Sequence, residues 1–225
     1  MTTVVTGYYG SGKTEFCVNL ALQIAGQGNS VTIADLDVSN PYFRSREAAR
    51  GPSPAFGDCP RITVISDHFG GNTGQDIPAT SYAFLPKIRA GEDVILDLAG
   101  GKTGIRLLAN CYEAIQSAKY EFLCVLNLFR PETNSPEKMI DFVQSINQIS
   151  QVRITGLVNN GNLLHETTPD HILASQSAIL AAAAKLNLPL RHTLISKDLY
   201  NQIPDMIQSD NILTFDKLKM REPWQ

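Results

Sequence analysis

Cysteine is scarce in this chain and is not arranged to hold a metal. The four cysteines, Cys17, Cys59, Cys111 and Cys124, form no C-x-x-C pair and have no zinc-finger spacing. The spacing therefore argues against a zinc-binding module, and it gives no support to a metal-cluster role for Cys59 and Cys111. We expect reduced thiols and a cytoplasmic location.

Long apolar runs and basic clusters are also missing. No stretch reaches the roughly 18 apolar residues of a membrane-spanning helix. Residues 1–7 lack the basic and apolar regions of a signal peptide, so we expect none. The formal net charge is −3, and there is no basic tail and no basic amphipathic segment at the C-terminal end. We therefore expect neither nucleic acid nor a membrane surface as a partner.

The 225 residues do contain a regular alternation of two patterns, and 43% of them are hydrophobic. Short β-branched runs predict strands at 3–6, 30–37, 61–66, 93–101, 121–129, 152–160 and 190–196. Helical spacing of apolar residues predicts helices at 13–28, 81–91, 104–118, 135–150 and 168–188. This alternation predicts a three-layer α/β fold with a mainly parallel sheet of about seven strands and helices on both faces. We expect one domain over residues 1–225, with functional loops at 38–60 and 67–80.

The segment "GYYGSGKT", residues 7–14, has the spacing G-x-x-x-x-G-K-[ST] between an expected strand and an expected helix. We call it the phosphate loop. Its glycines let backbone N–H groups curl around a polyphosphate, and the helix N-terminus adds a favourable dipole. Lys13 is expected to reach the terminal phosphates, and the Thr14 hydroxyl to bind magnesium. The residues expected to contact the nucleotide here are Gly7, Tyr8, Tyr9, Gly10, Ser11, Gly12, Lys13, Thr14 and Glu15.

Acidic residues follow two other expected strands. Asp97 begins a D-x-x-G pattern, in which the aspartate can hold magnesium through water and Gly100 can offer its N–H to a γ-phosphate. Asp35 and Asp37 end the second strand, at the edge of the sheet where open α/β folds bind ligands. Two carboxylates are costly together unless a cation or a reacting water uses them. The alternative is that one caps a turn and the other is solvated.

The phosphate loop, "DLDVSNPYFR" (35–44) and "ILDLAGG" (95–101) together resemble the MinD/ParA/CobQ family. That family belongs to the class of P-loop NTPases that includes the nitrogenase iron protein and the signal recognition particle GTPases. The resemblance implies a mainly parallel sheet, ATP with magnesium, and often a homodimer across the nucleotides. It also implies a catalytic phosphate-binding role for Lys13 and magnesium binding by Thr14. One of Asp35 and Asp37 would position the attacking water, with Asp37 favoured, and Asp97 would serve the magnesium ion.

The chain departs from that family at Tyr8. Many members carry a second lysine at this position, whereas a phenol has no positive charge. Hydrolysis is therefore expected to be slow unless Arg44, Arg46 or Lys102 supplies charge at the γ-phosphate. A solvated surface position is the alternative for each of these three. Tyr8 and Tyr9 are a hypothetical subunit contact, because tyrosine is enriched at interfaces.

The base is expected to lie beside "VNNGN", residues 158–162. GTPases of this class commonly read guanine with N-K-x-D, whose carboxylate accepts two N–H bonds. Asn162 cannot do so, since an amide offers one acceptor group and one donor group. Asn159 and Asn160 can still bond the adenine edge, which favours ATP over GTP. The loop 195–205 is expected to pack nearby.

These patterns favour an ATP-binding protein that acts as a slow, magnesium-dependent ATPase. It would serve as a nucleotide-dependent switch or as an assembly factor for an unidentified protein client, binding ATP and ADP in turn. One alternative is a small-molecule kinase or ATP-dependent ligase similar to dethiobiotin synthetase, with an acceptor pocket made by the loops 38–60 and 67–80. Another is a GTPase or a non-catalytic nucleotide-binding module.

Overall fold

The computed structural model describes residues 1–37, 59–66 and 82–219. These residues form an eight-stranded sheet in the order β3-β2-β4-β1-β5-β6-β7-β8. Every neighbouring pair of strands in it is parallel. The strands are β1 (Thr2–Gly7), β2 (Val31–Leu36), β3 (Ile62–Ser66), β4 (Asp93–Leu98), β5 (Tyr120–Leu126), β6 (Gly156–Asn159), β7 (Leu190–Ser196) and β8 (Asn211–Phe215). The parallel α/β fold expected from the sequence is confirmed.

The sheet gains β8 beyond the seven expected strands. This strand has only five residues and pairs with β7 alone, at the edge of the sheet. Its apolar Leu213 and Phe215 are buried, whereas Asn211 and Thr214 are exposed. So short a run between two irregular segments is hard to identify before its partner strand is known.

The helices follow the expected alternation with shifted ends. They are α1 (Lys13–Gly26), α3 (Leu85–Arg89), α4 (Gly101–Leu107), α5 (Tyr112–Ser117), α6 (Pro136–Ile149), α7 (Pro169–Leu186) and α8 (Lys197–Tyr200). Short 3₁₀ turns are η1 (Leu108–Cys111), η2 (Leu164–Glu166) and η3 (Pro204–Met206). The helix expected at 104–118 is therefore two helices joined by η1, and α3 is shorter than expected because Pro86 falls in its first turn. None of the described helices is both long and apolar enough to cross a membrane.

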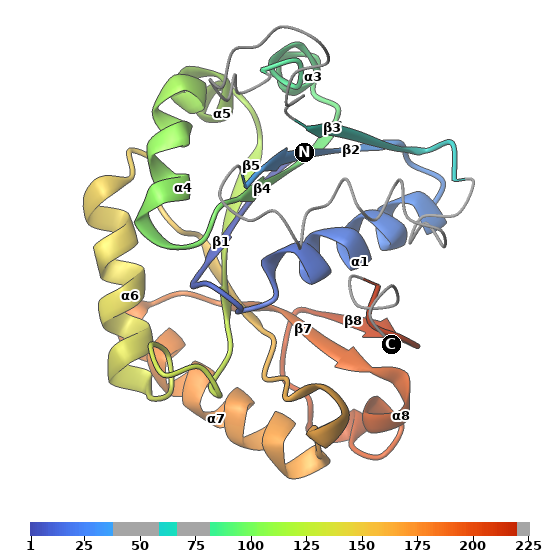
Figure 1. The fold of residues 1–225 in the computed structure, drawn as a ribbon, viewed down its shortest axis with the longest axis vertical. Helices are drawn as coiled ribbons and strands as arrows, with labels where there is room; N and C mark the ends of the chain where they lie inside the picture. The colour runs from blue at the N-terminus through green and yellow to red at the C-terminus, as the bar shows by residue number, and fades with distance from the viewer. Residues whose placement is uncertain (38–58, 67–81, 220–225) are drawn as a thin grey trace, which may run out of the picture.

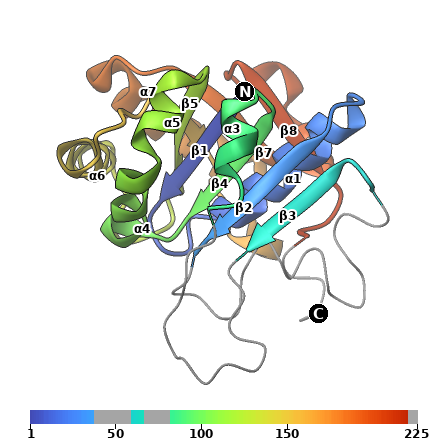
Figure 2. The ribbon, with the colours of Figure 1, turned by 90° about the horizontal axis from the view of Figure 1, so that it is seen from above.

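Two apolar layers hold the helices to the sheet, because alternate residues of each strand point to opposite faces. Val4 packs with the layer that includes Ile105, Met139 and Ile179, under α4 to α7. Its neighbour Val5 packs with the other layer, which includes Phe16 and other residues of α1. Figures 1 and 2 show α1 on one side of the sheet and α4 to α6 on the other.

The parallel strands bring several loops to one edge of the sheet. β1 lies between β4 and β5, and β6 is the next strand along. The segments that follow β1, β2, β4, β5 and β6 therefore meet at the carboxyl ends of the strands, where open α/β sheets bind ligands. The candidate site is built from these segments.

Candidate functional site

The phosphate loop folds back on itself so tightly that two of its glycines have no room for a side chain. Gly12 has φ +90°, and a Cβ there would collide with the Asn160 Nδ2 atom. A Cβ on Gly7 would lie 2.5 Å from the Val125 carbonyl oxygen of β5. The loop is therefore pressed against β5 and against the segment after β6, with its amides left to line the turn.

The N-terminus of α1 leaves its amides without a side-chain cap. The other long helices, α6 and α7, begin with Ser135 and Thr168, whose hydroxyls accept from the backbone N–H groups of Lys138 and His171. α1 instead begins at Gly12 in the left-handed conformation, and this N-cap residue has no side chain to accept from the first turn. Helix amides left in this way, together with the helix dipole, make a site for an anion.

Lys13 lies inside the loop, only 7% exposed, and its Nζ donates to the Tyr8 carbonyl at 3.2 Å. Burial lowers the pKa of this lysine, while the charges of Asp97 and Asp37 raise it. A loop lysine would ordinarily be a solvated surface cation. Here it is a buried one held between a carbonyl and nearby carboxylates, which orients its charge toward the loop.

The aspartates expected at the sheet edge gather on the α1 side. Asp35 and Asp97 are direct partners in the parallel pairing of β2 with β4, so both point to the same face as Ile33 and Ile95, which pack against α1. Asp35 accepts the backbone N–H of Asp37 at 3.2 Å. Of the three, Asp37 lines the cavity described below, while Asp35 and Asp97 are buried behind it.

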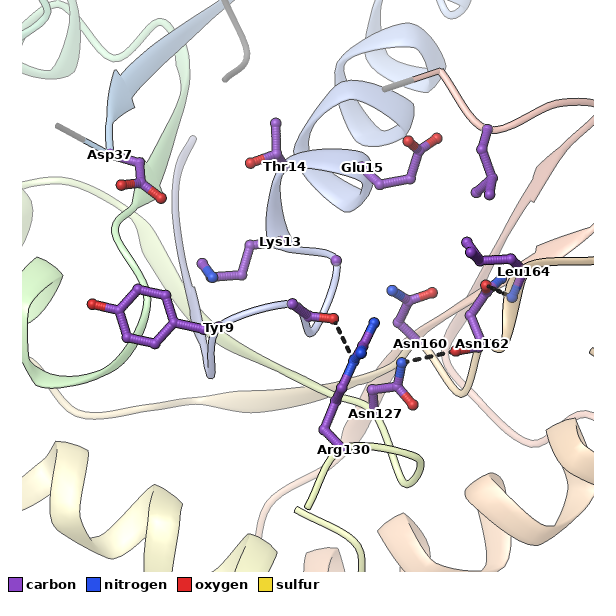
Figure 3. A pocket seen from close by; sticks show the side chains of 13 residues that line it. Tyr9, Lys13, Thr14, Glu15, Asp37, Asn127, Arg130, Asn160, Asn162 and Leu164 are labelled. Atoms are coloured by element: carbon purple, nitrogen blue, oxygen red, sulfur yellow. Dashed lines mark hydrogen bonds between the residues drawn. The ribbon is translucent and has the colours of Figure 1, made fainter. Parts of the chain in front are cut away.

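A cavity of about 190 Å³ opens beside the phosphate loop (Figure 3). Its wall comes from the loop and α1, from the ends of β2, β5 and β6, and from the segment after β8. The lining residues are Tyr9, Gly10, Gly12, Lys13, Thr14, Glu15, Asp37, Asn127, Arg130, Asn160, Asn162, Leu164 and Leu218. A second cavity of about 180 Å³ shares Asn162, Leu164 and Leu218 with the first, so the two are neighbours.

The three asparagines at the end of β6 and just after it have different surroundings. Asn160 lines the cavity, and its amide donates to the Ser11 carbonyl at 2.7 Å. Asn162 also lines it, and its Oδ1 accepts the Leu164 N–H at 2.6 Å. Asn159 is fully buried, and its Oδ1 accepts from Ser175 and from the Gly161 N–H. Asn159 therefore shapes the segment, whereas Asn160 and Asn162 face the cavity.

The two tyrosines of the loop point in different directions. The Tyr8 ring packs edge-on against Phe142 of α6, with 5.7 Å between ring centroids. Tyr9 is 49% exposed and lies over Gly100, where a Cβ would come within 2.7 Å of its ring. Tyr8 therefore packs within its own chain, and Tyr9 separates the Gly100 backbone from open solvent.

Of the cations expected to supply charge, Lys102 is exposed at the start of α4 and does not line the cavity, while Arg44 and Arg46 lie outside the described residues. The structure instead places Arg130 in the cavity wall, where its Nε donates to the Gly10 carbonyl at 2.9 Å. Arg130 follows β5, which pairs with β1, and this pairing cannot be read from the order of elements in the chain.

The segment after β8 also contributes to the candidate site, which the sequence did not predict. The backbone N–H of Lys219 donates to Glu15 Oε1 at 2.8 Å, and the same carboxylate oxygen accepts from Asn19. Leu218 lines both cavities as a result. Most of "DLDVSNPYFR", from residue 38 on, and nearly all of the loops 38–60 and 67–80 lie outside the described residues.

The arrangement fits a polyphosphate with magnesium. The uncapped amides and Lys13 supply donors and positive charge to phosphate oxygens, and Thr14 places a hydroxyl in the same wall. No group of three or more His, Cys, Asp or Glu able to hold a metal occurs among the residues that the structure describes. Magnesium in nucleotide sites needs no such group, because phosphates and water supply most of its ligands.

No protein-family model and no curated protein matches this chain. Solved structures do resemble it. The cell division protein FtsY of Thermotoga maritima is 23% identical, with a TM-score of 0.55, over 86% of this chain and 60% of the FtsY chain. Chloroplast FtsY of Physcomitrella patens is 18% identical, with a TM-score of 0.55, over 85% of this chain and 57% of its own. The signal recognition particle receptor FtsY of Elizabethkingia anophelis, solved with GDP, is 17% identical, with a TM-score of 0.54, over 85% and 56%.

These likenesses show that the chain has the fold of a P-loop NTPase. They agree with the wider class inferred from the sequence, which includes the signal recognition particle GTPases. They do not support the narrower MinD/ParA/CobQ assignment, because the three structures compared above are FtsY proteins. The chain spans about 60% of the length of the first FtsY chain.

Proposed function

We propose that this protein is a magnesium-dependent nucleoside-triphosphate hydrolase that binds ATP at the phosphate loop. The observation that carries the proposal is the uncapped start of α1 with Lys13 buried inside the loop. Lys13 is held beside this helix start by the Tyr8 carbonyl and the charges of Asp97 and Asp37. A polyphosphate would bond both.

Each residue has a distinct role in this proposal. Lys13 and the amides of residues 10–15 hold the phosphates, and Thr14 holds magnesium together with water bound by Asp97 or Asp35. Magnesium would neutralise charge on the phosphates. Asp37 lines the cavity, and its carboxylate would accept from the attacking water and orient it. Asp35 fixes the backbone of Asp37 by accepting its N–H.

The nucleoside would extend from the first cavity into the second. Three residues line both cavities, so the two lie side by side between the phosphate loop and the segments after β6 and β7. Asn162 lines both cavities, and its side-chain oxygen already accepts the Leu164 N–H. Its amide N–H₂ can donate to a ring nitrogen of adenine, but it cannot accept from the two N–H groups of guanine.

GTP is the second candidate, and one observation favours it. Asp216 lines the second cavity, and a carboxylate is the group that accepts two guanine N–H bonds. FtsY of Elizabethkingia anophelis was solved with GDP. Against this reading, Asp216 is already paired with Lys197 at 2.9 Å. A guanine would have to compete with that lysine.

We further propose the MinD/ParA/CobQ type of switch or assembly factor, supported by the sequence "DLDVSNP" that begins at the end of β2. A homodimer across the nucleotide and a protein client belong to the same proposal. The kinase or ligase alternative needs a pocket for an acceptor molecule, and nearly all of the loops 38–60 and 67–80 expected to form it lie outside the described residues.

Phosphate release tests the hydrolase directly. Wild-type protein with magnesium and ATP should release phosphate slowly without any added acceptor, and EDTA should stop it. Thr14→Val should lower the rate and weaken the dependence on magnesium, because it removes the hydroxyl and keeps the shape. Release that requires an added small-molecule acceptor would favour the kinase instead, and no release or binding with any nucleotide would overturn the proposal.

A further inference from the structure

Arg130 occupies the wall of the cavity opposite Asp37 (Figure 3). It follows β5 in the loop 127–135 and is half-buried. Its Nε donates to the Gly10 carbonyl at 2.9 Å, and its guanidinium carbon would lie 3.4 Å from a Cβ on Gly10. The guanidinium therefore rests directly on the phosphate loop.

The loop 127–135 is held firmly enough to place that side chain. Asn127 accepts the Phe129 N–H through its side chain at 2.9 Å, and its backbone carbonyl accepts the Arg130 N–H at 3.2 Å and the Thr133 hydroxyl at 2.7 Å. The Asn127 amide donates to the Asn162 carbonyl at 3.1 Å. Arg130 thus projects from a turn that is bonded both to itself and to the segment after β6.

Only one of the guanidinium's N–H groups is used by the described part of the chain. Arg130 forms no ion pair there, and its Nη atoms have no hydrogen-bond partner in residues 1–37, 59–66 and 82–219. An arginine has five N–H donors in a planar fork that suits phosphate oxygens. The remaining N–H donors of Arg130 therefore lie beside the phosphate loop, where phosphate oxygens would bind.

Arg130 can supply the positive charge that is missing because position 8 is a tyrosine and not a lysine. Tyr8 carries no positive charge, and its ring packs against Phe142. Lys102 does not line the cavity. Lys13 and Arg130 are the basic side chains among the described lining residues. A second positive charge from the same chain would remove the need for a lysine from a partner subunit.

Resting on the proposed function, we propose that Arg130 is a phosphate-binding residue that supplies this second charge in cis. Its Nε anchors the side chain on the Gly10 carbonyl, and its Nη groups bind the terminal phosphates and stabilise the charge that develops on them. The site in one chain then carries both cations needed for hydrolysis.

Two substitutions separate the anchor from the charge. Arg130→Gln places an amide nitrogen where Nε was, so it keeps the donor to Gly10 and loses the charge. Arg130→Lys does the opposite, because a methylene replaces Nε while the charge remains. The matched control is Lys138→Ala, since Lys138 is an exposed cation that donates to the Pro131 carbonyl of the same loop at 2.7 Å and does not line the cavity.

The measurements are single-turnover hydrolysis, and the affinities for inorganic tripolyphosphate, a non-hydrolysable ATP analogue and ADP. An arginine at the transferring phosphate is worth about 10³-fold in rate or more, so Arg130→Gln should slow hydrolysis by at least tenfold. Arg130→Gln should also lower the affinity for tripolyphosphate and for the ATP analogue more than the affinity for ADP. Arg130→Lys should retain more activity than Arg130→Gln, and Lys138→Ala should match wild type.

Three results would overturn the proposal. If Arg130→Gln hydrolyses like wild type while Arg130→Lys fails, Arg130 only positions Gly10. If Arg130→Gln and Lys138→Ala behave alike, the charge has no role at the phosphates. In both cases wild type still binds tripolyphosphate, and the proposed function stands. Wild-type protein that binds neither tripolyphosphate nor any nucleotide would remove the proposed function and this inference together.

Discussion

The side-chain amide of Asn160 donates to the carbonyl of Ser11 at 2.7 Å, across 149 residues of sequence. This bond ties the segment after β6 to the middle of the phosphate loop. It also explains the glycine at position 12, because the same amide nitrogen occupies the space that a Cβ would need. The shape of the phosphate loop therefore depends on a residue at the other side of the cavity.

Asn160→Ala should weaken polyphosphate binding. The substitution leaves the Ser11 carbonyl buried without its donor, which costs about 1–3 kcal/mol and corresponds to about 5- to 150-fold in affinity if the loop reorganises. Calorimetric titration with tripolyphosphate measures the effect. The control is Asn134→Ala, an exposed asparagine in the loop 127–135. Equal affinities for the two variants would show that the bond does not hold the loop.

Gly12→Ala should abolish nucleotide binding, whereas Gly28→Ala should not affect it. The two glycines have nearly the same φ, +90° and +91°. A Cβ on Gly28 would meet nothing within 4 Å, while one on Gly12 would collide with Asn160. Gly28→Ala should therefore cost only the backbone strain, about 1 kcal/mol, in the free energy of unfolding. Chemical denaturation and nucleotide titration of both variants would separate strain from collision, and full binding by Gly12→Ala would contradict the described loop.

Asn162→Asp should shift the base preference toward GTP. Asp keeps the oxygen that accepts the Leu164 N–H, so the local turn is preserved. It replaces the amide N–H₂ with a second acceptor, which suits the two guanine N–H groups. Competition between ATP and GTP for the wild type and the variant measures the shift. An unchanged ratio would mean that Asn162 does not face the base, and Asp216→Asn would then be the next variant to test.

His192 should make the protein less stable as the pH falls below neutrality. It is buried on β7 beside Phe16, and burial lowers its pKa to about 4, with Asp210 raising it and Arg191 lowering it. The unfolded histidine titrates near 6.5, so between about pH 6.5 and 4 the unfolded state binds more protons. The folded state thus loses up to roughly 3 kcal/mol across that window.

His192→Gln should flatten this part of the stability profile. Urea denaturation at several pH values between 7 and 4.5 gives the slope, with His165→Gln, an exposed histidine, as the control. Both variants keep every carboxylate of the chain, so the difference between the two slopes reports on His192. Identical slopes would show that His192 is solvated or protonated in the folded protein.

The sequence was sufficient to predict what is local in this fold. The alternation of patterns gave the parallel α/β class, and the spacing from Gly7 to Thr14 gave the loop and the start of α1. Side chains that depend on which strands are neighbours were not predictable. Arg130 reaches Gly10 because β5 lies beside β1, and Asn160 reaches Ser11 because β6 lies beside β5. The burial of Lys13 depends on the same neighbours.

Two other features could not be read from residue types. Asn159 and Asn160 are adjacent and chemically identical, yet one bonds Ser175 inside the fold and the other faces the cavity, because successive residues point in opposite directions as β6 ends. The short strand β8 becomes recognisable only when its pairing with β7 is known. Its position brings Leu218 and Lys219 to the cavity and to Glu15.

Calorimetric titration of the wild-type protein with ATP and with GTP, each in the presence of magnesium, tests the central claim most directly. The account predicts saturable binding of ATP that is tighter than binding of GTP, and no binding of either nucleotide to Gly12→Ala. Tighter binding of GTP would correct the base and leave the phosphate site intact. If the folded wild-type protein bound neither nucleotide, or if Gly12→Ala bound ATP as tightly as wild type, the assignment of residues 7–14 as a nucleotide site would be wrong.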